Sequence, residues 1–165
     1  MNLIVAVDNN FGIGKGGVMP WHISEDLKHF KAMTLNKTVI MGRKTLESLP
    51  GGKPLKERNN IVITSDRSFE CDGVTVCNTI DEVVKKVKKL AQKDVFVIGG
   101  ASIYSQLLPY CDRAYVTHVL ADYEVDTYMV DIEDSPDWIL ETMGEEKESG
   151  GVRYRFDVYV NRGTA

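Results

Sequence analysis

Residues 18–30, VMPWHISEDLKHF, place one carboxylate where an amphipathic helix should turn apolar side chains toward the core. At about 100° per residue, Leu27, Phe30 and Met33 define an apolar arc of roughly 120°, and Asp26 falls inside it. A carboxylate in an apolar pocket is costly unless it has a partner. A ligand with two parallel N–H donors would satisfy it. The alternative is an aspartate that faces water and is favoured there by the helix dipole.

Residues 12–17, GIGKGG, match the G-x-G-x-x-G pattern of dinucleotide-binding proteins, but their surroundings differ. That pattern needs a helix that starts within it and an acidic residue about 20 positions later. Here Pro20 disfavours helical backbone at Met19, and the acidic residue is missing. We interpret the segment as a mobile lid in which Met19 and Trp21 cover a ligand. A solvated loop is the alternative, although a large aromatic side chain needs something to pack on.

Three places where a strand should give way to a helix or loop carry groups that suit phosphate: residues 41–45 (MGRKT), 63–67 (ITSDR) and 97–102 (VIGGAS). Cations, hydroxyls and the free N–H groups of a helix start all favour anionic ligands. Each segment alone is weak, because Arg43 and Lys44 could simply be solvated and glycine also suits helix–strand packing. Together they favour a ligand with more than one phosphate, such as a phosphorylated dinucleotide. The glycine that opens a P-loop is absent, which disfavours nucleotide hydrolysis.

The elements that must position these groups follow from hydrophobic periodicity. Apolar runs predict strands at residues 3–7, 38–41, 60–64, 74–76, 95–98, 114–119 and 154–160. Helices are predicted at residues 24–36, from Gly42 through 49, within 78–93 and at 101–108, and loops at residues 8–17 and 50–54. Strand–helix alternation predicts one α/β domain, residues 1–165, with a mostly parallel sheet and antiparallel strands at its C-terminal end. Ligands of such sheets bind at the carboxyl ends of the strands.

The predicted helix within residues 78–93 carries a run of lysines opposite an apolar stripe. The stripe consists of Ile80, Val83, Val84, Val87 and Leu90. We interpret the lysines as a solvated face rather than as a docking site for an acidic partner.

Composition excludes several classes of protein. The chain has 165 residues, 43% of them hydrophobic, and a net charge of −4, which gives no electrostatic reason to expect nucleic acid as a partner. Its three cysteines form no C-x-x-C pair, which argues against a metal site or a disulfide framework. No signal peptide is recognisable, and no segment approaches the roughly 20 apolar residues of a membrane span. We therefore expect a cytoplasmic protein without a membrane partner.

Six segments resemble the dihydrofolate reductase family in order and spacing. They are MPW at 19–21, ED-L--F at 25–30, VIMGRKT at 39–45, NNIVIT at 59–64, VIGGASIY at 97–104 and THV at 117–119. The resemblance implies NADPH-dependent reduction of 7,8-dihydrofolate to 5,6,7,8-tetrahydrofolate, with hydride to C6 and a proton to N5, for one-carbon metabolism. It implies an eight-stranded, mostly parallel sheet with an antiparallel C-terminal strand and about four helices. It also implies a monomer that antifolates such as methotrexate or trimethoprim inhibit.

The resemblance implies roles for individual residues. Asp26 would hold the pterin 2-amino group and N3, Thr117 would support that carboxylate, and Arg58 would bind the glutamate α-carboxylate. The implied catalytic residues are Met19, Trp21, Asp26 and Thr117. The implied substrate-binding residues are Ile4, Val5, Ala6, Asp26, Leu27, Phe30, Leu49, Leu55, Arg58, Ile98 and Thr117. The implied cofactor-binding residues are Ala6, Ile13, Gly14, Met19, Gly42, Arg43, Lys44, Thr45, Ile63, Thr64, Ser65, Ile98, Gly99, Gly100, Ala101, Ser102, Ile103, Tyr104, Gln106 and Thr127. A cis peptide is implied between Gly99 and Gly100.

Three positions depart from the family pattern: His22 after the tryptophan, the segment 128–130 (YMV), and Ser102 where some members carry an arginine. Three other functions stay open. One is a different NADPH-dependent pterin or pyrimidine reductase, such as that of riboflavin synthesis. The others are a silent nucleotide-binding module and an interaction protein. None of these three needs an aspartate in an apolar arc together with Arg58.

Overall fold

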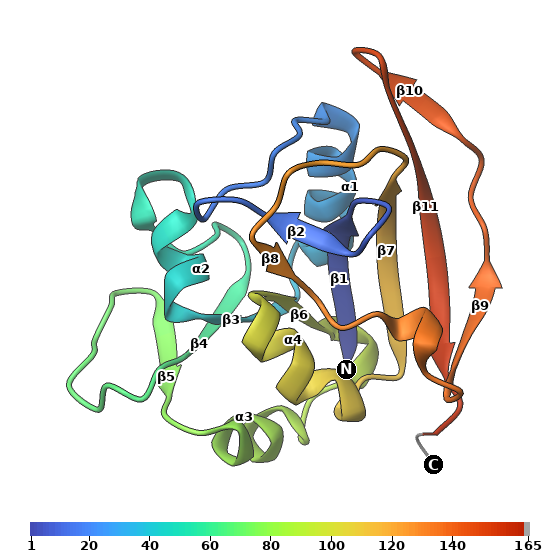
Figure 1. Cartoon of the computed structure of the whole chain (residues 1–165). Helices are drawn as coiled ribbons and strands as arrows, with labels where there is room; N and C mark the ends of the chain where they lie inside the picture. The colour runs from blue at the N-terminus through green and yellow to red at the C-terminus, as the bar shows by residue number, and fades with distance from the viewer. Residues whose placement is uncertain (164–165) are drawn as a thin grey trace.

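The computed structural model describes residues 1–163, which form one large sheet with helices on both faces (Figure 1). The strands are β1 (Asn2–Val7), β2 (Gly12–Gly14), β3 (Thr38–Gly42), β4 (Asn59–Ile63), β5 (Val74–Cys77), β6 (Val95–Gly99), β7 (Arg113–Val119), β8 (Thr127–Tyr128), β9 (Trp138–Thr142), β10 (Lys147–Ser149) and β11 (Val152–Asn161). The α-helices are α1 (Ser24–Thr34), α2 (Arg43–Ser48), α3 (Ile80–Val87) and α4 (Ala101–Leu107).

The main sheet has the strand order β10-β11-β7-β1-β6-β3-β4-β5, with β9 also paired to β11. Strands β7, β1, β6, β3, β4 and β5 run parallel, and β9, β10 and β11 add antiparallel pairs at one edge. Because β7 occupies one edge of β11, both β9 and β10 lie along its other edge, β9 against residues 158–161 and β10 against 152–154. Nine strands therefore fill eight positions, which confirms the predicted eight-stranded mixed sheet.

Side chains divide between the two faces of the sheet by strand parity. On one face, Ile4, Val39 and Phe96 pack with Phe30 and Met33 of α1. The other face packs against α3 and α4 and holds the larger cluster, which includes Leu3, Val5, Ile40, Val97, Val83, Ile103 and Leu107. The core is thus two apolar layers separated by the sheet.

All four predicted helices are shorter in the structure, and for α1 and α3 the local reason is clear. The chain leaves α1 at Thr34 rather than at Asn36, because Leu35 has a non-helical ψ of 130° and Asn36 then adopts a left-handed φ of 62°. The helix α3 ends at Val87, where the side-chain amide of Gln92 donates to the Val87 carbonyl over 2.9 Å. Leu90 therefore lies beyond the helix and is 39% exposed, so its predicted place in the apolar stripe was wrong.

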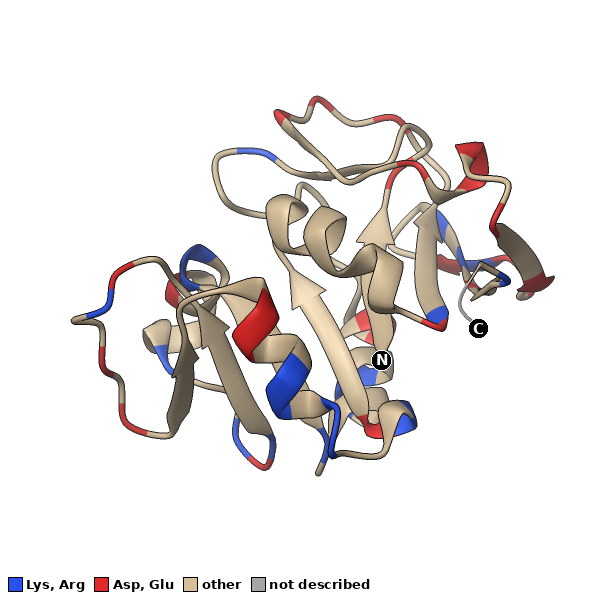
Figure 2. Cartoon of the chain, turned by 90° about the horizontal axis from the view of Figure 1, so that it is seen from below, with Lys and Arg blue, Asp and Glu red and all other residues tan. Residues whose placement is uncertain are grey.

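The charges on α3 follow the helix dipole, as Figure 2 shows by colour. Asp81 and Glu82 lie in the first turn, and Lys85 and Lys86 in the last. Cations stabilise a helix C-terminus and anions an N-terminus. The helix α4, by contrast, contains no charged residue.

Four short strands were missed by the sequence analysis. The segment 8–17, predicted to be a loop, contains β2, which pairs with β8 in a separate two-stranded sheet. The other two, β9 and β10, form the interrupted edge strand on β11. Strands of two to five residues leave little room for an alternating pattern to show. Among residues 1–163, no helix has the length and apolar character needed to span a membrane.

Candidate active site

Asp26 lies in the first turn of α1 and is held against the sheet by β7. The Thr117 hydroxyl donates a hydrogen bond to Asp26 Oδ1 over 2.7 Å, across 91 residues of sequence. The side chain is half-buried, and burial raises the pKa of the Asp26 carboxyl above its ordinary value. The bond from Thr117 and the nearby His29 oppose that rise. The carboxylate thus faces the sheet and not open water, which excludes the alternative of a solvated helix-start aspartate.

The apolar residues that were predicted to line a substrate pocket gather on the same face of the sheet. The cluster beside α1 includes Ile4, Phe30, Leu49, Leu55 and Ile98. These come from β1, α1, β6 and the segment after α2, so distant parts of the sequence meet here.

Two predicted lining residues behave differently from that cluster. Leu27 is 46% exposed and does not belong to the cluster. The side chain of Val5 packs in the other core layer with Leu3 and Val97, on the face opposite Asp26. The prediction that the Val5 side chain lines this face was therefore wrong, because the period-two alternation of β1 sends it the other way.

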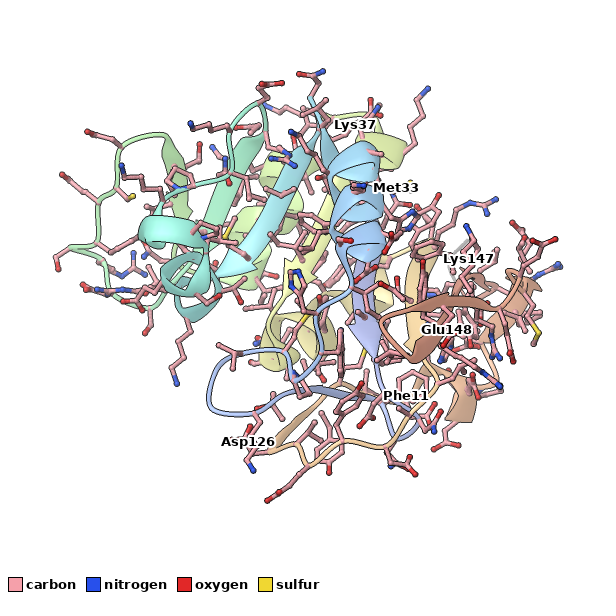
Figure 3. The ribbon with its side chains drawn as sticks, turned by 90° about the horizontal axis from the view of Figure 1, so that it is seen from above. Phe11, Met33, Lys37, Asp126, Lys147 and Glu148 are labelled. Atoms are coloured by element: carbon pink, nitrogen blue, oxygen red, sulfur yellow. The ribbon has the colours of Figure 1, made fainter. Side chains whose placement is uncertain are left out.

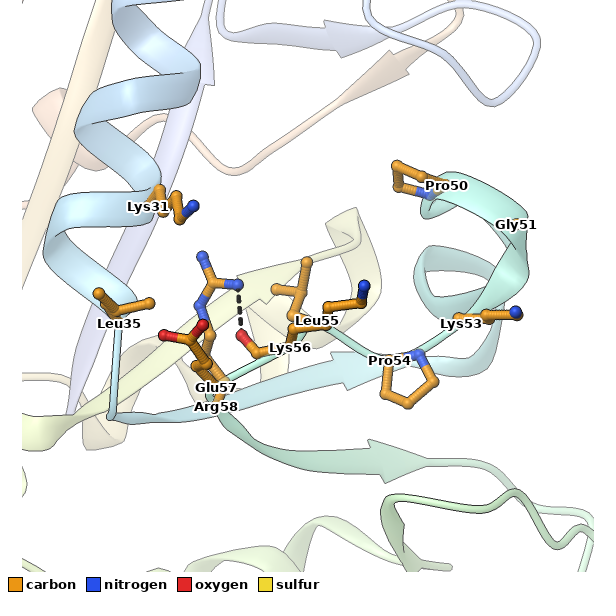
Figure 4. A pocket seen from close by; sticks show the side chains of 10 residues that line it. All are labelled: Lys31, Leu35, Pro50, Gly51, Lys53, Pro54, Leu55, Lys56, Glu57 and Arg58. Atoms are coloured by element: carbon orange, nitrogen blue, oxygen red, sulfur yellow. Dashed lines mark hydrogen bonds between the residues drawn. The ribbon is translucent and has the colours of Figure 1, made fainter.

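A cavity of about 550 Å³ opens near the C-terminal end of α1 (Figure 4). Its lining includes Lys31, Leu35, Leu55, Lys56 and Arg58. Arg58 Nη1 donates to the Lys56 carbonyl over 2.8 Å, and its Nε donates to Thr34 Oγ1 over 3.3 Å. These bonds orient the guanidinium, and partial burial lowers its pKa. The cavity is rich in cations, in a protein whose net charge is −4.

Asp26 does not line this cavity but lies toward the other end of the same helix. Nine residues separate Asp26 from Leu35, which corresponds to about 13 Å along a helix axis. An apolar stretch that includes Phe30 and Leu55 connects the two ends. The site can therefore hold an elongated ligand with paired N–H donors at one end and a carboxylate at the other.

The three predicted phosphate-friendly junctions lie side by side, because β6, β3 and β4 are neighbouring parallel strands. A Cβ atom on Gly42 would lie 3.2 Å from Ile103 Cγ1, and one on Gly99 would lie 3.3 Å from Thr45 Oγ1. The start of α2 therefore touches the start of α4. A side chain on either glycine would be tight against its neighbour, and the φ of 137° at Gly99 favours glycine there in addition. The peptide between Gly99 and Gly100 is cis, as the resemblance implied.

Arg43 links the α2 junction to the one after β4. Its Nη1 lies 3.0 Å from Asp66 Oδ2, and its guanidinium carbon lies 4.4 Å from the centre of the Phe69 ring. Lys44 and Ser65 are exposed beside this pair. The guanidinium is held in place rather than freely solvated, and Asp66 competes with any anionic ligand for it.

The glycine-rich segment is fixed at its base and open at its tip. Asp8 is fully buried, and its carboxylate accepts hydrogen bonds from the N–H groups of Asn10, Gly12 and Tyr123 over 2.8 to 3.2 Å. Further along, the Gly16 N–H donates a hydrogen bond over 3.0 Å to the carboxylate of Asp126, which is labelled in Figure 3.

At the tip, Val18 and Met19 are 67% and 47% exposed, but Trp21 is buried beside Tyr123. The indole N–H of Trp21 is the one buried side-chain donor without a hydrogen-bond partner within residues 1–163. No helix starts in GIGKGG, so the dinucleotide-fingerprint interpretation is excluded. An anchored segment with an exposed apolar tip fits a lid.

The remaining residues of the predicted cofactor groove lie around the same edge. Tyr104 is buried, and its hydroxyl donates to the Ile4 carbonyl over 2.8 Å, which ties α4 to β1. Gln106 donates to Ser102 Oγ, and Thr127 donates to Asp126. Ile13 and Ile63 pack against the larger core layer. The structure therefore brings the α4 residues, the lid base and the Thr45 junction into one region.

Sequence reasoning missed two side chains next to Asp26. His29 of α1 stacks on Phe156 of β11, with ring centres 4.1 Å apart and planes at 24°. The alternation in residues 152–161 could have placed Phe156 on one face of its strand. Only the pairing of β11 with β7 shows that this face is the one that carries Thr117.

Comparisons with known proteins agree with this geometry. Residues 1–161 match the family model described as dihydrofolate reductase. The chain is 36% identical to the dihydrofolate reductase of Bacillus subtilis (100% of this chain, 96% of that protein) and 37% identical to that of Schistosoma mansoni (96% and 95%). The structure is similar to dihydrofolate reductase from Enterococcus faecalis complexed with NADP(H) and RAB-propyl. The TM-score is 0.86 at 33% identity, with coverage of 97% of this chain and 95% of that one.

Proposed function

The chain belongs to the dihydrofolate reductase family, and from that membership we propose how its residues share the work of the reaction. The activity is the NADPH-dependent reduction of dihydrofolate. The assignment of individual residues, the binding of particular antifolates, a monomeric state and a cytoplasmic location belong to the proposal.

Asp26 binds the pterin ring through its 2-amino group and N3. The observation that carries this assignment is the hydrogen bond from Thr117 to a half-buried carboxylate in an otherwise apolar helix face. Thr117 fills one of the roughly four acceptor positions of the carboxylate. One position on Oδ1 and those on Oδ2 remain for the ligand, so two parallel donors can bind both oxygens. Phe30, Leu49, Leu55 and Ile98 then bury the ring system, with Ile4 and Ala6 of β1 beneath it.

Arg58 binds the α-carboxylate of the glutamate moiety at the other end of the site. A guanidinium already oriented by Thr34 and the Lys56 carbonyl loses little freedom when it binds a carboxylate in bidentate fashion. The separation of about 13 Å along α1 suits a ligand with a pterin, an aminobenzoyl group and a glutamate in line.

The three junctions at the carboxyl ends of β3, β4 and β6 would hold NADPH. Arg43, Lys44, Thr45, Thr64 and Ser65 fit its phosphates, including the 2′-phosphate, with Asp66 released from Arg43 as the phosphate binds. Bound at Gly99–Gly100, this cofactor supplies the hydride. Residues of the lid and of α4 then complete the groove and exclude bulk water.

The proton for N5 arrives by water and not directly from Asp26. A carboxylate that holds N3 cannot also reach N5, and no other ionisable side chain of the proposed set lies at the pterin. The lid tip, with Met19 and Trp21, controls access of that water. The indole N–H of Trp21, which has no hydrogen-bond partner within residues 1–163, is a suitable donor to such a water molecule.

The test is Asp26→Asn, followed as loss of NADPH near-UV absorbance after dihydrofolate is added. The amide keeps the shape but loses the charge and one acceptor, so kcat/KM at neutral pH should fall about a hundredfold, or about 2.7 kcal/mol. The matched control is Glu25→Gln, which neutralises the exposed neighbouring carboxylate and should keep wild-type activity. Full activity of Asp26→Asn at pH 7 would remove Asp26 from the mechanism.

Inhibition by methotrexate, measured in the same assay, tests the proposal for antifolates, and sedimentation of the purified chain tests the monomeric state. Replacement of Arg58 by Lys separates the two ends of the site. It should raise the KM for dihydrofolate with little change in kcat, because the carboxylate contact is the same in the ground state and in the transition state.

A further inference from the structure

We propose that His29 is a positioning residue for Asp26. The His29 ring holds the N-terminal part of α1 against β11, and its charge helps to keep the Asp26 carboxylate ionised at mildly acidic pH. The inference rests on the proposed role of Asp26 in substrate binding. It adds a residue that no part of the catalytic scheme above uses.

His29 lies one helical turn after Asp26, and residues three apart are neighbours on a helix surface. Its imidazole does not extend into solvent but stacks on the Phe156 ring, 4.1 Å away and within 24° of parallel. The stack fixes the rotation of α1 about its axis one turn after Asp26.

Phe156 is the direct cross-strand partner of Thr117 in the antiparallel pair of β11 and β7. Side chains opposite each other in such a pair share one face of the sheet and lie about 5 Å apart at Cβ. Thr117 in turn donates the hydrogen bond to Asp26. Asp26, His29, Phe156 and Thr117 therefore form a closed circuit of contacts, which crosses from α1 to β11 to β7 and back.

The charged groups that face His29 come from two elements. Asp26 on α1 attracts the imidazolium, whereas Lys147 on β10 repels it. The Lys147 ammonium lies 5.4 Å from the centre of the Phe156 ring, so it belongs to the same cluster. The exposed Glu25, on the same helix, lies toward Ser149 of β10. His29 thus stands between the substrate-binding carboxylate and a surface lysine.

These surroundings bring the pKa values of His29 and Asp26 closer together. Burial, with help from Lys147, lowers the pKa of His29, and burial raises the pKa of Asp26. When His29 is protonated, its positive charge stabilises the ionised Asp26 carboxylate and so lowers the pKa of Asp26. Both groups are partly exposed, so solvent screens the effect and keeps it modest.

A purely structural role for His29 makes a different prediction from a charged one. Phenylalanine at position 29 would keep the stack on Phe156 but carry no charge. Glutamine would lose the ring but remain polar and neutral. Lys147→Met leaves His29 in place and removes the cation that disfavours its protonation. These three variants separate packing from charge.

The experiment measures the titration midpoint of Asp26 by NMR of carboxyl-¹³C aspartate in the full chain, with the signal assigned by its loss in Asp26→Asn. Both His29→Phe and His29→Gln should raise the midpoint, by a few tenths to about one pH unit. Lys147→Met should lower it, and should have no effect in the His29→Phe background. An unchanged midpoint in His29→Phe would overturn the proposal, even if thermal stability changed.

The pH profile of kcat/KM for dihydrofolate gives a second readout, in which the inflection due to Asp26 should move in the same direction as the NMR midpoint. This design separates the two hypotheses. Activity retained by Asp26→Asn would refute the proposed substrate contact but leave the NMR test of His29 intact. If the titration midpoint of Asp26 is the same in the His29 variants as in the wild type, only the proposed role of His29 is refuted.

Discussion

Each face of the strand pair β7–β11 contacts one carboxylate, Asp26 on one face and Asp157 on the other. The protein binds these two carboxylates differently. On the face toward α1, Thr117 donates the single hydrogen bond that the Asp26 carboxylate receives within residues 1–163. On the opposite face, the fully buried carboxylate of Asp157 accepts from Arg155 Nε over 2.8 Å and from the Gly144 N–H over 3.0 Å. The imidazole of His118 lies 3.5 Å away.

The difference separates a structural carboxylate from a binding one. The protein supplies a backbone donor to one oxygen of Asp157 and a cation to the other, and full burial leaves a ligand no access to either. Gly144 lies in the segment between β9 and β10, where a Cβ atom would collide with the Phe156 backbone. Through its bond from the Gly144 N–H, Asp157 therefore fixes the position of the segment that interrupts the edge strand between β9 and β10. Asp26 has one neutral donor and unused acceptor capacity, which is costly unless a ligand supplies the rest.

The largest effect that tests this contrast is loss of stability in Asp157→Ala. The change leaves the partly buried guanidinium of Arg155 and the Gly144 N–H without their acceptor. Breaking a buried pair on one side costs about 3 to 5 kcal/mol, and we expect about 3 because Arg155 is 21% exposed. Urea unfolding should show a lower midpoint with an unchanged m value.

Activity is the informative control for that variant. Per folded molecule, Asp157→Ala should retain wild-type kcat/KM, because Asp157 projects from the face opposite Thr117. A variant that keeps its stability but loses turnover would reverse the assignment of the two carboxylates.

A smaller effect is expected from Thr117→Val, which removes the hydroxyl but keeps the volume. Asp26 then loses its only protein donor, and its pKa should rise further, because that hydrogen bond lowers it. A charge-assisted bond of this kind contributes about 1.5 kcal/mol, so kcat/KM should fall about tenfold. Thr117→Ser, which keeps the donor, should restore most of the loss. If valine and serine behave alike, the hydroxyl plays no part in holding Asp26.

The contrast between the two faces also shows what the sequence could predict. The apolar arc around Asp26 is a local pattern of 11 residues of helix, and its oddity was visible in the sequence. The alternation of residues 154–160 likewise predicted a strand with two faces. The partners of Asp157 were not predictable in this way, because Gly144 and His118 reach it only through the register of β7 and the break between β9 and β10.

The same limit explains the other differences. Val5 was assigned to the substrate side by the family resemblance, yet a single step along β1 turns its side chain to the opposite face. The end of α3 depends on a cap from Gln92, five residues beyond Val87, which no hydrophobic period signals. Local periodicity thus predicted most elements and the position of Asp26. Contacts that depend on strand register needed the structure.

The smallest expected effect is the pH dependence of stability in Asp26→Asn. Because the folded-state pKa of Asp26 is raised, the protonated carboxyl favours folding. That contribution is fully present below the pKa of an unfolded aspartate, about 3.9, and is lost as pH rises through the folded-state pKa. An asparagine cannot ionise, so the free energy of unfolding of Asp26→Asn minus that of the wild type should increase with pH across this window and then level off. Urea unfolding of both chains in matched buffers measures the difference. A difference that falls with rising pH would mean that the folded protein stabilises the ionised carboxylate without a ligand, and Asp26 would then resemble Asp157.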